Sequence, residues 1–467
     1  MRFLPCFLLL TAATLPAWGG GFDDPFSTDA MAPLKVSPSL AARVGEAPCA
    51  TALPVTPLTA LDAVDLALCN HPQTREVWAS ARAQAALVGV ARAGWLPSLD
   101  ASASATRFQV DDGASYNRRA AALTLSWLLV DFGRRSANVE NAQQLLAAAA
   151  ATQDAMVQSL FLAALQAYYS AQAAQAAVIS ATEAERSARE SYQAADARYG
   201  VGVATPADRL QAQTALSQAT LNRIRAEGEA RNGLGALANA LGFAAQQSIV
   251  LAELPAELPA TSGELAFQKE IDALIAEAQA RRPDLRAAEA QLKAAEASVD
   301  IARSQGRPSV SLAAGPSWQN TAGVVAQGGS VGLTLNVPIF TGFDTTYRVR
   351  SAAALADVRA AQRDRIRNQI ALDVWRAYQS LTTATQSLKT TADLVASAEQ
   401  SARVALGRYK AGVGTVLDLL TAQSALASAR LQRIQAQLDW NVYRATLAQA
   451  MGALDYTLLQ AAAEGRP

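Results

Sequence analysis

Two copies of the motif Tyr-x-x-Gly-x-x-Thr-x-x-Asp contain the side chains of this sequence most suited to acting on other molecules. The copies end at Asp208 and Asp418. A glycine can end one helix, a threonine can cap the next, and an acid three residues later can complete a capping box. The predicted capping residues are Gly202, Thr205, Gly412 and Thr415. Capping could be the whole role of the two acids.

The same acids could also form a gate. If the turns between the helices lie at the closed end of a tube, the carboxylates of Asp208 and Asp418 would create a negative field at its opening. Capping and gating are compatible roles, and both remain open.

Other reactive residue types do not indicate an enzyme. The chain has one histidine, His71, so a histidine-based acid–base set is excluded, and it contains no P-loop. Gly233 to Ala238 match a dinucleotide-binding pattern only as letters, because they follow a predicted helix rather than a strand. His71 precedes Pro72, which indicates a turn at the end of a helix. We expect no catalytic residues and no cofactor.

The N-terminus predicts export. Residues 1–21 contain Arg2, an apolar run from Phe3 to Leu10 and small residues near Ala17, which is the pattern of a cleaved secretory signal. A short membrane anchor is the alternative, but the run is too short to span a bilayer. We therefore expect the chain to leave the cytoplasm.

The mature chain keeps two cysteines, Cys49 and Cys69. Because oxidising compartments favour disulfides, a bond between them is the default, and a loop of this size is worth about 3 kcal/mol in the chain-entropy model. Two reduced, buried thiols are the alternative. A metal site is less favoured, because no cluster of ligands surrounds His71.

Charge and composition exclude one class of partner and favour helices. The 40 basic residues equal the 40 acidic residues, whereas nucleic-acid-binding proteins concentrate Lys and Arg, so nucleic acid is not an expected partner. Hydrophobic residues make up 51% of the chain and aromatic residues only 6%, and alanine is abundant. Such a chain suits closely packed helices better than a thick globular core.

The chain repeats one pattern at an offset of 210 or 211 residues. Matching positions include Tyr168 with Tyr378, Tyr199 with Tyr409, Gly202 with Gly412 and Gly242 with Gly452. A nearly constant offset over about 180 residues indicates a duplication. The expected segments are a signal peptide (1–21), a proline-rich extended arm (22–57), a first repeat (58–242), a linker (243–263), a second repeat (264–452) and a C-terminal tail (453–467).

Each repeat contains a predicted β-hairpin, at about 98–130 and about 309–340. Apolar residues alternate there with small or polar ones, as in Leu123-Thr124-Leu125. Such alternation over about ten residues is typical of strands that cross a membrane beside a wet lumen. A pair of soluble amphipathic hairpins is the alternative. No apolar run of eighteen residues follows the signal, so no transmembrane helix is expected.

Two hairpins supply only four strands. An open four-stranded sheet would leave unpaired backbone edges in lipid, where each unsatisfied group costs several kcal/mol. If these strands span a membrane, other copies of the chain must close the barrel.

The longest predicted helices are 136–199 and about 347–409, which contain no proline. At 1.5 Å per residue, some 64 residues make a rod of roughly 95 Å. Helices of this length belong to coiled coils, membrane spans or helical tubes, and the scarcity of large seam residues argues against a two-stranded coil. The alanine content could instead reflect only helix propensity and a GC-biased genome, which would not explain the length.

Together these features resemble the TolC-like outer-membrane factors over essentially the whole mature chain. Residues 125–133 and 335–343 are similar to that family's strand-to-helix junction, and the second copy, with Pro338 and Gly342, is the more typical. The resemblance implies a mostly α-helical, tandem-duplicated fold with a small β part. It also implies a homotrimer in which four transmembrane strands per protomer form a twelve-stranded barrel in outer-membrane lipid, continued by a long helical barrel in the periplasm.

The resemblance further implies partners and a gate. The partners are a periplasmic adaptor (membrane fusion protein) and an inner-membrane transporter. The aperture is narrowed by the second-repeat turn, which here carries Asp418, with Tyr409 as a candidate tether. The family often has a second acid three residues further on, where this chain has Thr421.

The expected function is an exit duct of a tripartite export system. The arrangement of Cys49 and Cys69, together with the proline-rich arm, resembles the channels of type I protein (toxin) secretion, which work with an ABC transporter. A multidrug or metal efflux channel is the alternative. A soluble periplasmic adaptor or scaffold is a further alternative, but it would leave the paired alternating strands unexplained.

Overall fold

The computed structural model describes residues 24–34, 57–109, 113, 115–252 and 271–454. The signal peptide, Cys49, the second half of the linker and nearly all of the C-terminal tail lie outside these residues. The described part of the arm contains one short helix, α1 (Thr28–Met31), where the sequence predicts an extended segment. The Asp24 carboxylate accepts hydrogen bonds from the Thr28 hydroxyl and the Asp29 amide, which stabilises this turn.

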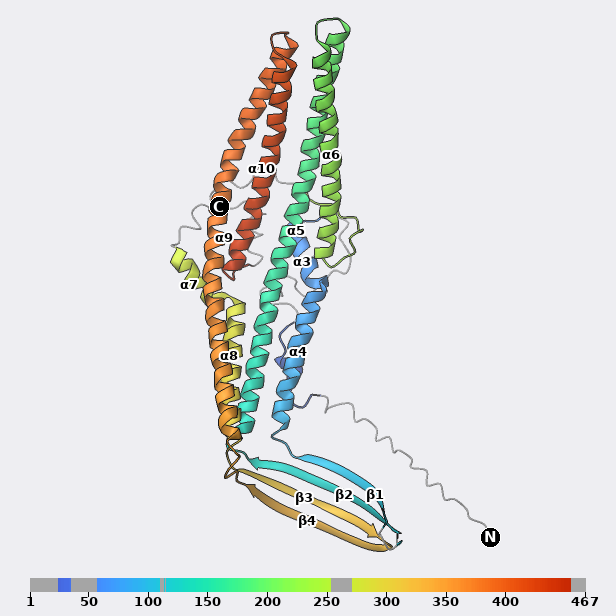
Figure 1. Ribbon diagram of the computed structural model, residues 1–467, viewed down its shortest axis with the longest axis vertical. Helices are drawn as coiled ribbons and strands as arrows, with labels where there is room; N and C mark the ends of the chain where they lie inside the picture. The colour runs from blue at the N-terminus through green and yellow to red at the C-terminus, as the bar shows by residue number, and fades with distance from the viewer. Residues whose placement is uncertain (1–23, 35–56, 110–112, 114, 253–270, 455–467) are drawn as a thin grey trace, which may run out of the picture. The chain divides into compact units, whose positions relative to one another are not determined.

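The remaining elements occur in the same order twice (Figure 1), as two helices, two strands, one long helix and one shorter helix. The first set is α3 (Ala60–Asn70), α4 (Pro72–Ala93), β1 (Ser98–Gln109), β2 (Ser115–Val130), α5 (Arg134–Gly200) and α6 (Pro206–Ala240). The second set is α7 (Ile271–Arg281), α8 (Pro283–Ser304), β3 (Ser309–Thr321), β4 (Val324–Asn336), α9 (Asp344–Lys410) and α10 (Val416–Ala450). The predicted fold class, mostly helical with a small sheet, is confirmed.

The duplication also fixes the lengths of the helices. The long helices α5 and α9 each contain 67 residues, and the shorter helices α6 and α10 each contain 35. Both predicted long helices are confirmed. The pattern Gly233 to Ala238 lies within α6, which excludes the strand-to-helix turn of a dinucleotide site.

One helix meets a simple length and composition criterion for crossing a membrane. The helix α5 contains an 18-residue window of mean hydropathy 1.3, so by length and composition alone it could cross a membrane. The reason is its alanine content, which raises the mean hydropathy even where Gln and Ser interrupt the apolar run. Of this window 33% is buried within the protein, and the helix is far longer than the roughly 20 residues that a bilayer requires.

The described chain forms two compact units. One contains the sheet with the adjoining helix ends, and it consists of residues 24–33, 81–146 and 296–352. The other contains the remaining helical segments, and its largest core includes Phe161 and Leu165 of α5, Leu237 of α6 and Val64 of α3. Many core residues are alanines, which allow close approach of helix backbones.

The four strands form one antiparallel sheet in the order β1-β2-β3-β4 (Figure 1). Residues in register share a face, so the pairings divide the sheet into two faces. The apolar face includes Leu99, Ala101, Ala103, Leu123, Leu125, Trp127, Leu312, Val331, Leu333 and Leu335. The polar face includes Ser98, Asp100, Ser102, Ser104, Thr124, Ser126, Ser317, Ser330, Thr334 and Asn336. The predicted alternation is confirmed.

The contact between β2 and β3 is unusually close at one point. Strand β3 is paired on both sides, yet it contains Pro316, which has no N–H to donate. On the facing part of β2, Leu123 and Thr124 have no registered partner on β3. A Cβ atom added to Gly315 would overlap the Leu123 carbonyl oxygen and lie 2.9 Å from its carbon. Glycine is therefore required at this crossing.

Candidate functional site

The two helical turns have the geometry that the motif predicts. Gly202 and Gly412 have φ angles of +78° and +79°, a left-handed conformation that ends α5 and α9. In the first turn, the Asp208 amide donates to the Thr205 hydroxyl at 3.2 Å and the Thr205 amide donates to the Asp208 carboxylate at 3.0 Å. In the second turn, Thr415 and Asp418 make the same exchange at 3.1 and 3.4 Å.

Asp418 and Thr421 lie on the exposed side of α10, three residues apart and therefore on neighbouring positions of one face. Asp208 occupies the matching place on α6, where it is half-buried. Each protomer thus presents one fully exposed carboxylate on the first turn of α10. Three residues after Asp418, the chain carries the hydroxyl of Thr421 and no second carboxylate.

Tyr409 does not share this exposure. Its side chain is only 5% exposed, and it packs with Val416 and Leu419 of the second turn and with Ala195 and Ala212 of the first. Burial of the ring raises the pKa of its phenol above the usual value. The Tyr409 hydroxyl has no hydrogen-bond partner among the described residues. Tyr409 therefore belongs to the core that joins the two hairpins rather than to an exposed lining.

Sequence reasoning missed Arg198, which makes a polar contact between the two hairpins. Its guanidinium donates to the Tyr409 carbonyl oxygen at 2.7 Å, and its central carbon lies 4.9 Å from the centroid of the Tyr409 ring. A guanidinium over an aromatic face is attractive, more so when the pair is shielded from water. The repeat hides this residue, because Arg408 occupies the matching position on α9.

The two tyrosines of the motif differ because their surroundings differ. Tyr199 is 39% exposed, and Arg209 lies over its ring at 5.5 Å while also pairing with Asp196 at 2.7 Å. The position that matches Arg209 in the second repeat is Leu419, which is fully buried. The second turn therefore has the buried, apolar Leu419 where the first turn has the charged Arg209.

The remaining predicted site residues can be placed in part. Cys69, at the end of α3, is disulfide-bonded, whereas Cys49 lies outside the described residues. The pairing of the two cysteines stays a prediction. His71 caps the C-terminus of α3, as expected for its position before Pro72. Within the described ranges, no group of three or more His, Cys, Asp or Glu side chains is arranged to hold a metal ion.

One further motif can be assigned to ordinary structure. Gly328 to Gly332 read Gly-x-Ser-x-Gly, the order found around hydrolase nucleophiles, but all five residues lie inside β4. A nucleophile turn needs a sharp strand-to-helix bend at the serine. Ser330 is instead a polar-face residue of the sheet.

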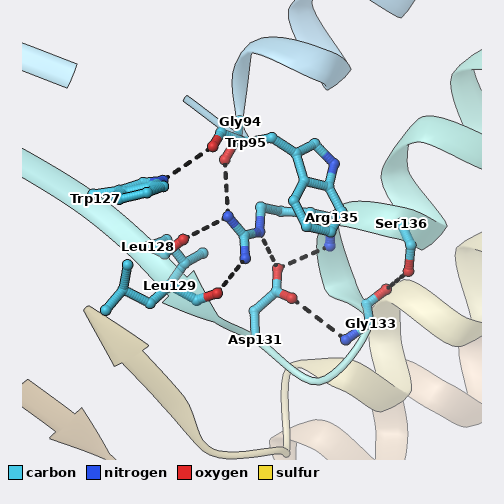
Figure 2. A network of polar contacts seen from close by, with 9 residues as sticks. All are labelled: Gly94, Trp95, Trp127, Leu128, Leu129, Asp131, Gly133, Arg135 and Ser136. Carbon is cyan, nitrogen blue, oxygen red and sulfur yellow. Dashed lines mark hydrogen bonds and ion pairs between the residues drawn. The ribbon is translucent and has the colours of Figure 1, made fainter. Parts of the chain in front are cut away.

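A buried ion pair holds the junction between β2 and α5 (Figure 2). The Arg135 Nε atom lies 3.1 Å from a carboxylate oxygen of Asp131, and the two side chains are only 7% and 6% exposed. The Asp131 carboxylate also accepts from the Arg135 amide at 2.9 Å and from the Gly133 amide at 3.4 Å. The acid therefore caps the first turn of α5 while it neutralises the arginine.

The Arg135 guanidinium connects three segments at this junction (Figure 2). It donates to the carbonyl oxygens of Leu128, Leu129 (3.0 Å) and Gly94 (3.5 Å). Its central carbon also lies 4.2 Å from the centroid of the Trp95 ring. The sequence singles out this junction but not Arg135. The i,i+4 spacing of an acid and an arginine was the available signal.

The matching junction between β4 and α9 has no such pair. At the offset of 210 residues, Thr341 and Thr345 replace Asp131 and Arg135, and their hydroxyl oxygens lie 3.3 Å apart. Within one protomer the neighbouring Ile339 is 94% exposed. The two repeats thus make the same bend with different chemistry.

The sequence model described as "Outer membrane efflux protein" matches residues 63–243 and 274–453, so each of the two matched segments covers one repeat. The chain belongs to this family. It is accordingly an outer-membrane protein of a channel family and not of an enzyme family.

Relatives in the outer membrane efflux protein family span different export systems. The chain is 35% identical over 387 residues to Protein CyaE of Bordetella pertussis, which covers 81% of this chain and 80% of that protein. It is 27% identical over 404 residues to the toluene efflux pump outer membrane protein TtgF of Pseudomonas putida, with 83% and 81% covered. It is 26% identical over 343 residues to the outer membrane protein TolC of Vibrio cholerae, with 70% and 74% covered.

Solved structures of the family share the fold. CusC superimposes with a TM-score of 0.75 at 20% identity, covering 84% of this chain and 92% of that one. The outer-membrane channel OprN superimposes with a TM-score of 0.73 at 24% identity, covering 84% and 90%. The predicted resemblance to TolC-like factors is confirmed.

Proposed function

We propose that this chain is the outer-membrane exit duct of a tripartite export system and that it works as a homotrimer. The observation that carries the proposal is the two-faced sheet. One face is apolar and the other polar, as lipid outside and water inside require. Its outer strands, β1 and β4, are edges within one protomer. Because unpaired edges are too costly in lipid, other copies must close the barrel, and three copies supply twelve strands.

The helical segments then extend into the periplasm. A periplasmic adaptor recruits the duct to an inner-membrane transporter. The helices and the hairpin turns of the strands lie at opposite ends of each strand, as the chain connectivity requires. The exposed first turn of α10, with Asp418, is the proposed aperture. Arg198 and the buried Tyr409 support it by joining the two hairpins of one protomer.

Among export systems, we propose type I protein secretion with an ABC transporter. The higher identity to CyaE, 35% against 27% for the toluene efflux protein, supports this choice. So does the position of the disulfide-bonded Cys69 directly before α4, within the arrangement that resembles such channels. Drug or metal efflux is the second candidate, supported by relatives such as TtgF.

A complementation experiment tests the system. The chain is expressed in bacteria that lack their own channel and that carry either a type I exporter with its adaptor and toxin substrate or a drug efflux pump with its adaptor. We expect it to restore release of the toxin into the medium and to leave drug sensitivity unchanged. Restored drug resistance without toxin release would replace the proposal by efflux, and restoration of neither would contradict a role as exit duct.

Neutralising the Asp418 carboxylate tests the gate. We expect Asp418→Asn to raise the closed-state single-channel conductance roughly twofold or more, because three carboxylates leave the aperture while the amide oxygen preserves most of the cap. Asp208→Asn is the matched control, since it changes the same capping position in the first repeat and should leave conductance within experimental error. An unchanged closed state in Asp418→Asn would remove this residue from the gate.

A further inference from the structure

On the first hairpin, the apolar face of the sheet ends at two arginines. On β1 this face is lined by Leu99, Ala101, Ala103 and Ala105, and the next residue on it is Arg107. On β2 it is lined from Trp127 back to Ala121, and the next residue on it is Arg119, which is in register with Ala105. In the row of Arg119, β3 carries the polar Asn320, whereas β1 carries Ala105 and β4 carries Val325. The two arginines therefore end the apolar face on the first hairpin, one row apart.

Tryptophans mark both ends of the apolar face. Trp318 is in register with Ala121, one row inside Arg119. Trp127 lies at the other end, where its indole N–H donates to the Trp95 carbonyl oxygen at 3.0 Å. From Trp127 to Ala121, the residue in register with Trp318, the strand advances six residues, about 20 Å along its length. Tryptophans are enriched at the interfaces between a membrane and water, which Trp318 fits by its place beside Arg119.

Arg107 and Arg119 lie just beyond the outer tryptophan. Both are exposed, and because they are diagonal neighbours on one face their Cα atoms are about 7–8 Å apart. Among the described strand residues, the sole acid is Asp100, and it lies on the polar face. Arg107 also donates to the Ser115 hydroxyl at 3.2 Å. Two guanidinium groups thus stand at the rim of the apolar face, which carries no carboxylate among the described strand residues.

The neighbouring Arg118 has a different environment. It points to the polar face, where its guanidinium donates to the Gln319 side-chain oxygen at 2.8 Å. Because adjacent strand residues face opposite sides, Arg118 lies on the polar face and Arg119 on the apolar face. A comparison of the two residues therefore distinguishes the effect of a water-facing arginine from that of a lipid-facing one. A positive charge in the lumen would require only Arg118 and does not account for Arg119.

We propose that Arg107 and Arg119 bind phosphate groups of lipopolysaccharide in the outer leaflet. The guanidinium groups match phosphate in charge and in hydrogen-bond geometry, and they lie at the headgroup level set by Trp318. The hairpin ends of the strands face outward if the helices extend into the periplasm, so the choice of outer-leaflet lipid rests on the proposed function. The second hairpin lacks the site, because Asn320 and Val325 occupy the row of Arg119 there.

Lipid binding to the purified, full-length oligomer tests the site. The protein is placed in nanodiscs of phosphatidylcholine with added lipid A or with added phosphatidylglycerol, and binding is measured by native mass spectrometry. We expect lipid A to be retained about 25-fold less by Arg107→Gln/Arg119→Gln than by the unaltered protein, and about fivefold less by each single variant. Arg118→Gln is the matched control and should bind lipid A normally.

Three results would overturn the site. These are normal lipid A binding by the double variant, equal loss in Arg118→Gln, and equal retention of phosphatidylglycerol and lipid A by the unaltered protein. Toxin release is measured in parallel, so that lost lipid A selectivity with normal release counts against this site alone. Normal selectivity without release counts against the proposed function.

Discussion

Replacing Arg135 by threonine is expected to lower the free energy of unfolding by about 3–5 kcal/mol. The substitution leaves the Asp131 carboxylate buried at 6% exposure without its counter-charge. It also releases the carbonyl oxygens of Leu128, Leu129 and Gly94 from their donor. Each buried polar group that loses its partner is destabilising in its own right. The measurement is the urea concentration at which the helical circular dichroism of the purified oligomer is half lost.

Two control variants separate charge from packing. Arg134→Thr changes the adjacent, half-buried arginine and should shift the midpoint by far less. Asp131→Thr/Arg135→Thr reproduces the Thr341 and Thr345 pair of the second junction, and it should recover part of the loss because no charge remains buried alone. A midpoint for Arg135→Thr equal to that of Arg134→Thr would show that the ion pair does not hold this junction.

Replacing Gly315 by alanine is expected to abolish most of the folded oligomer in the outer-membrane fraction. The new Cβ atom would overlap the Leu123 carbonyl oxygen, so β2 and β3 would have to separate at the middle of the sheet. Insertion of one carbon into a well-packed site typically costs about 1–3 kcal/mol, and here the obstacle is backbone that a side-chain rotation cannot relieve. The measurement is the amount of heat-modifiable oligomer on unboiled gels.

Gly332→Ala is the matched control for this substitution. Gly332 lies in β4 on the same polar face, and a Cβ atom there would have nothing within 4 Å. It should assemble as well as the unaltered chain. Equal assembly of Gly315→Ala and Gly332→Ala would contradict the close crossing of β2 and β3.

The sequence predicts most of the fold because the fold is periodic and written twice. Period-two alternation placed both hairpins, and the lack of proline placed α5 and α9. Neither the alternation nor the lack of proline requires tertiary contacts to be interpreted, because each depends on local backbone chemistry. The mean hydropathy of α5 is high because alanine counts as apolar, although each alanine buries little surface.

The candidate site was harder to predict, because pairing across hairpins is not visible in a repeat. Tyr199 and Tyr409 occupy the same motif position, yet one is exposed and the other buried, because Arg209 in one hairpin is Leu419 in the other. Arg198 and Arg408 are likewise equivalent in sequence, but only Arg198 reaches the opposite tyrosine. Local pattern identified the caps, and three-dimensional packing decided which member of each pair contributes to the contact.

The unequal junctions give the two halves of one protomer different mechanical properties. The connection between β2 and α5 is braced by a charged group that grips three carbonyl oxygens and an indole ring. The connection between β4 and α9 has a pair of hydroxyls and an exposed ion pair between Arg348 and Asp344, beside exposed apolar side chains. Because threonines occupy the positions of Asp131 and Arg135 in the second repeat, we expect the connection between β4 and α9 to bend more readily than the connection between β2 and α5.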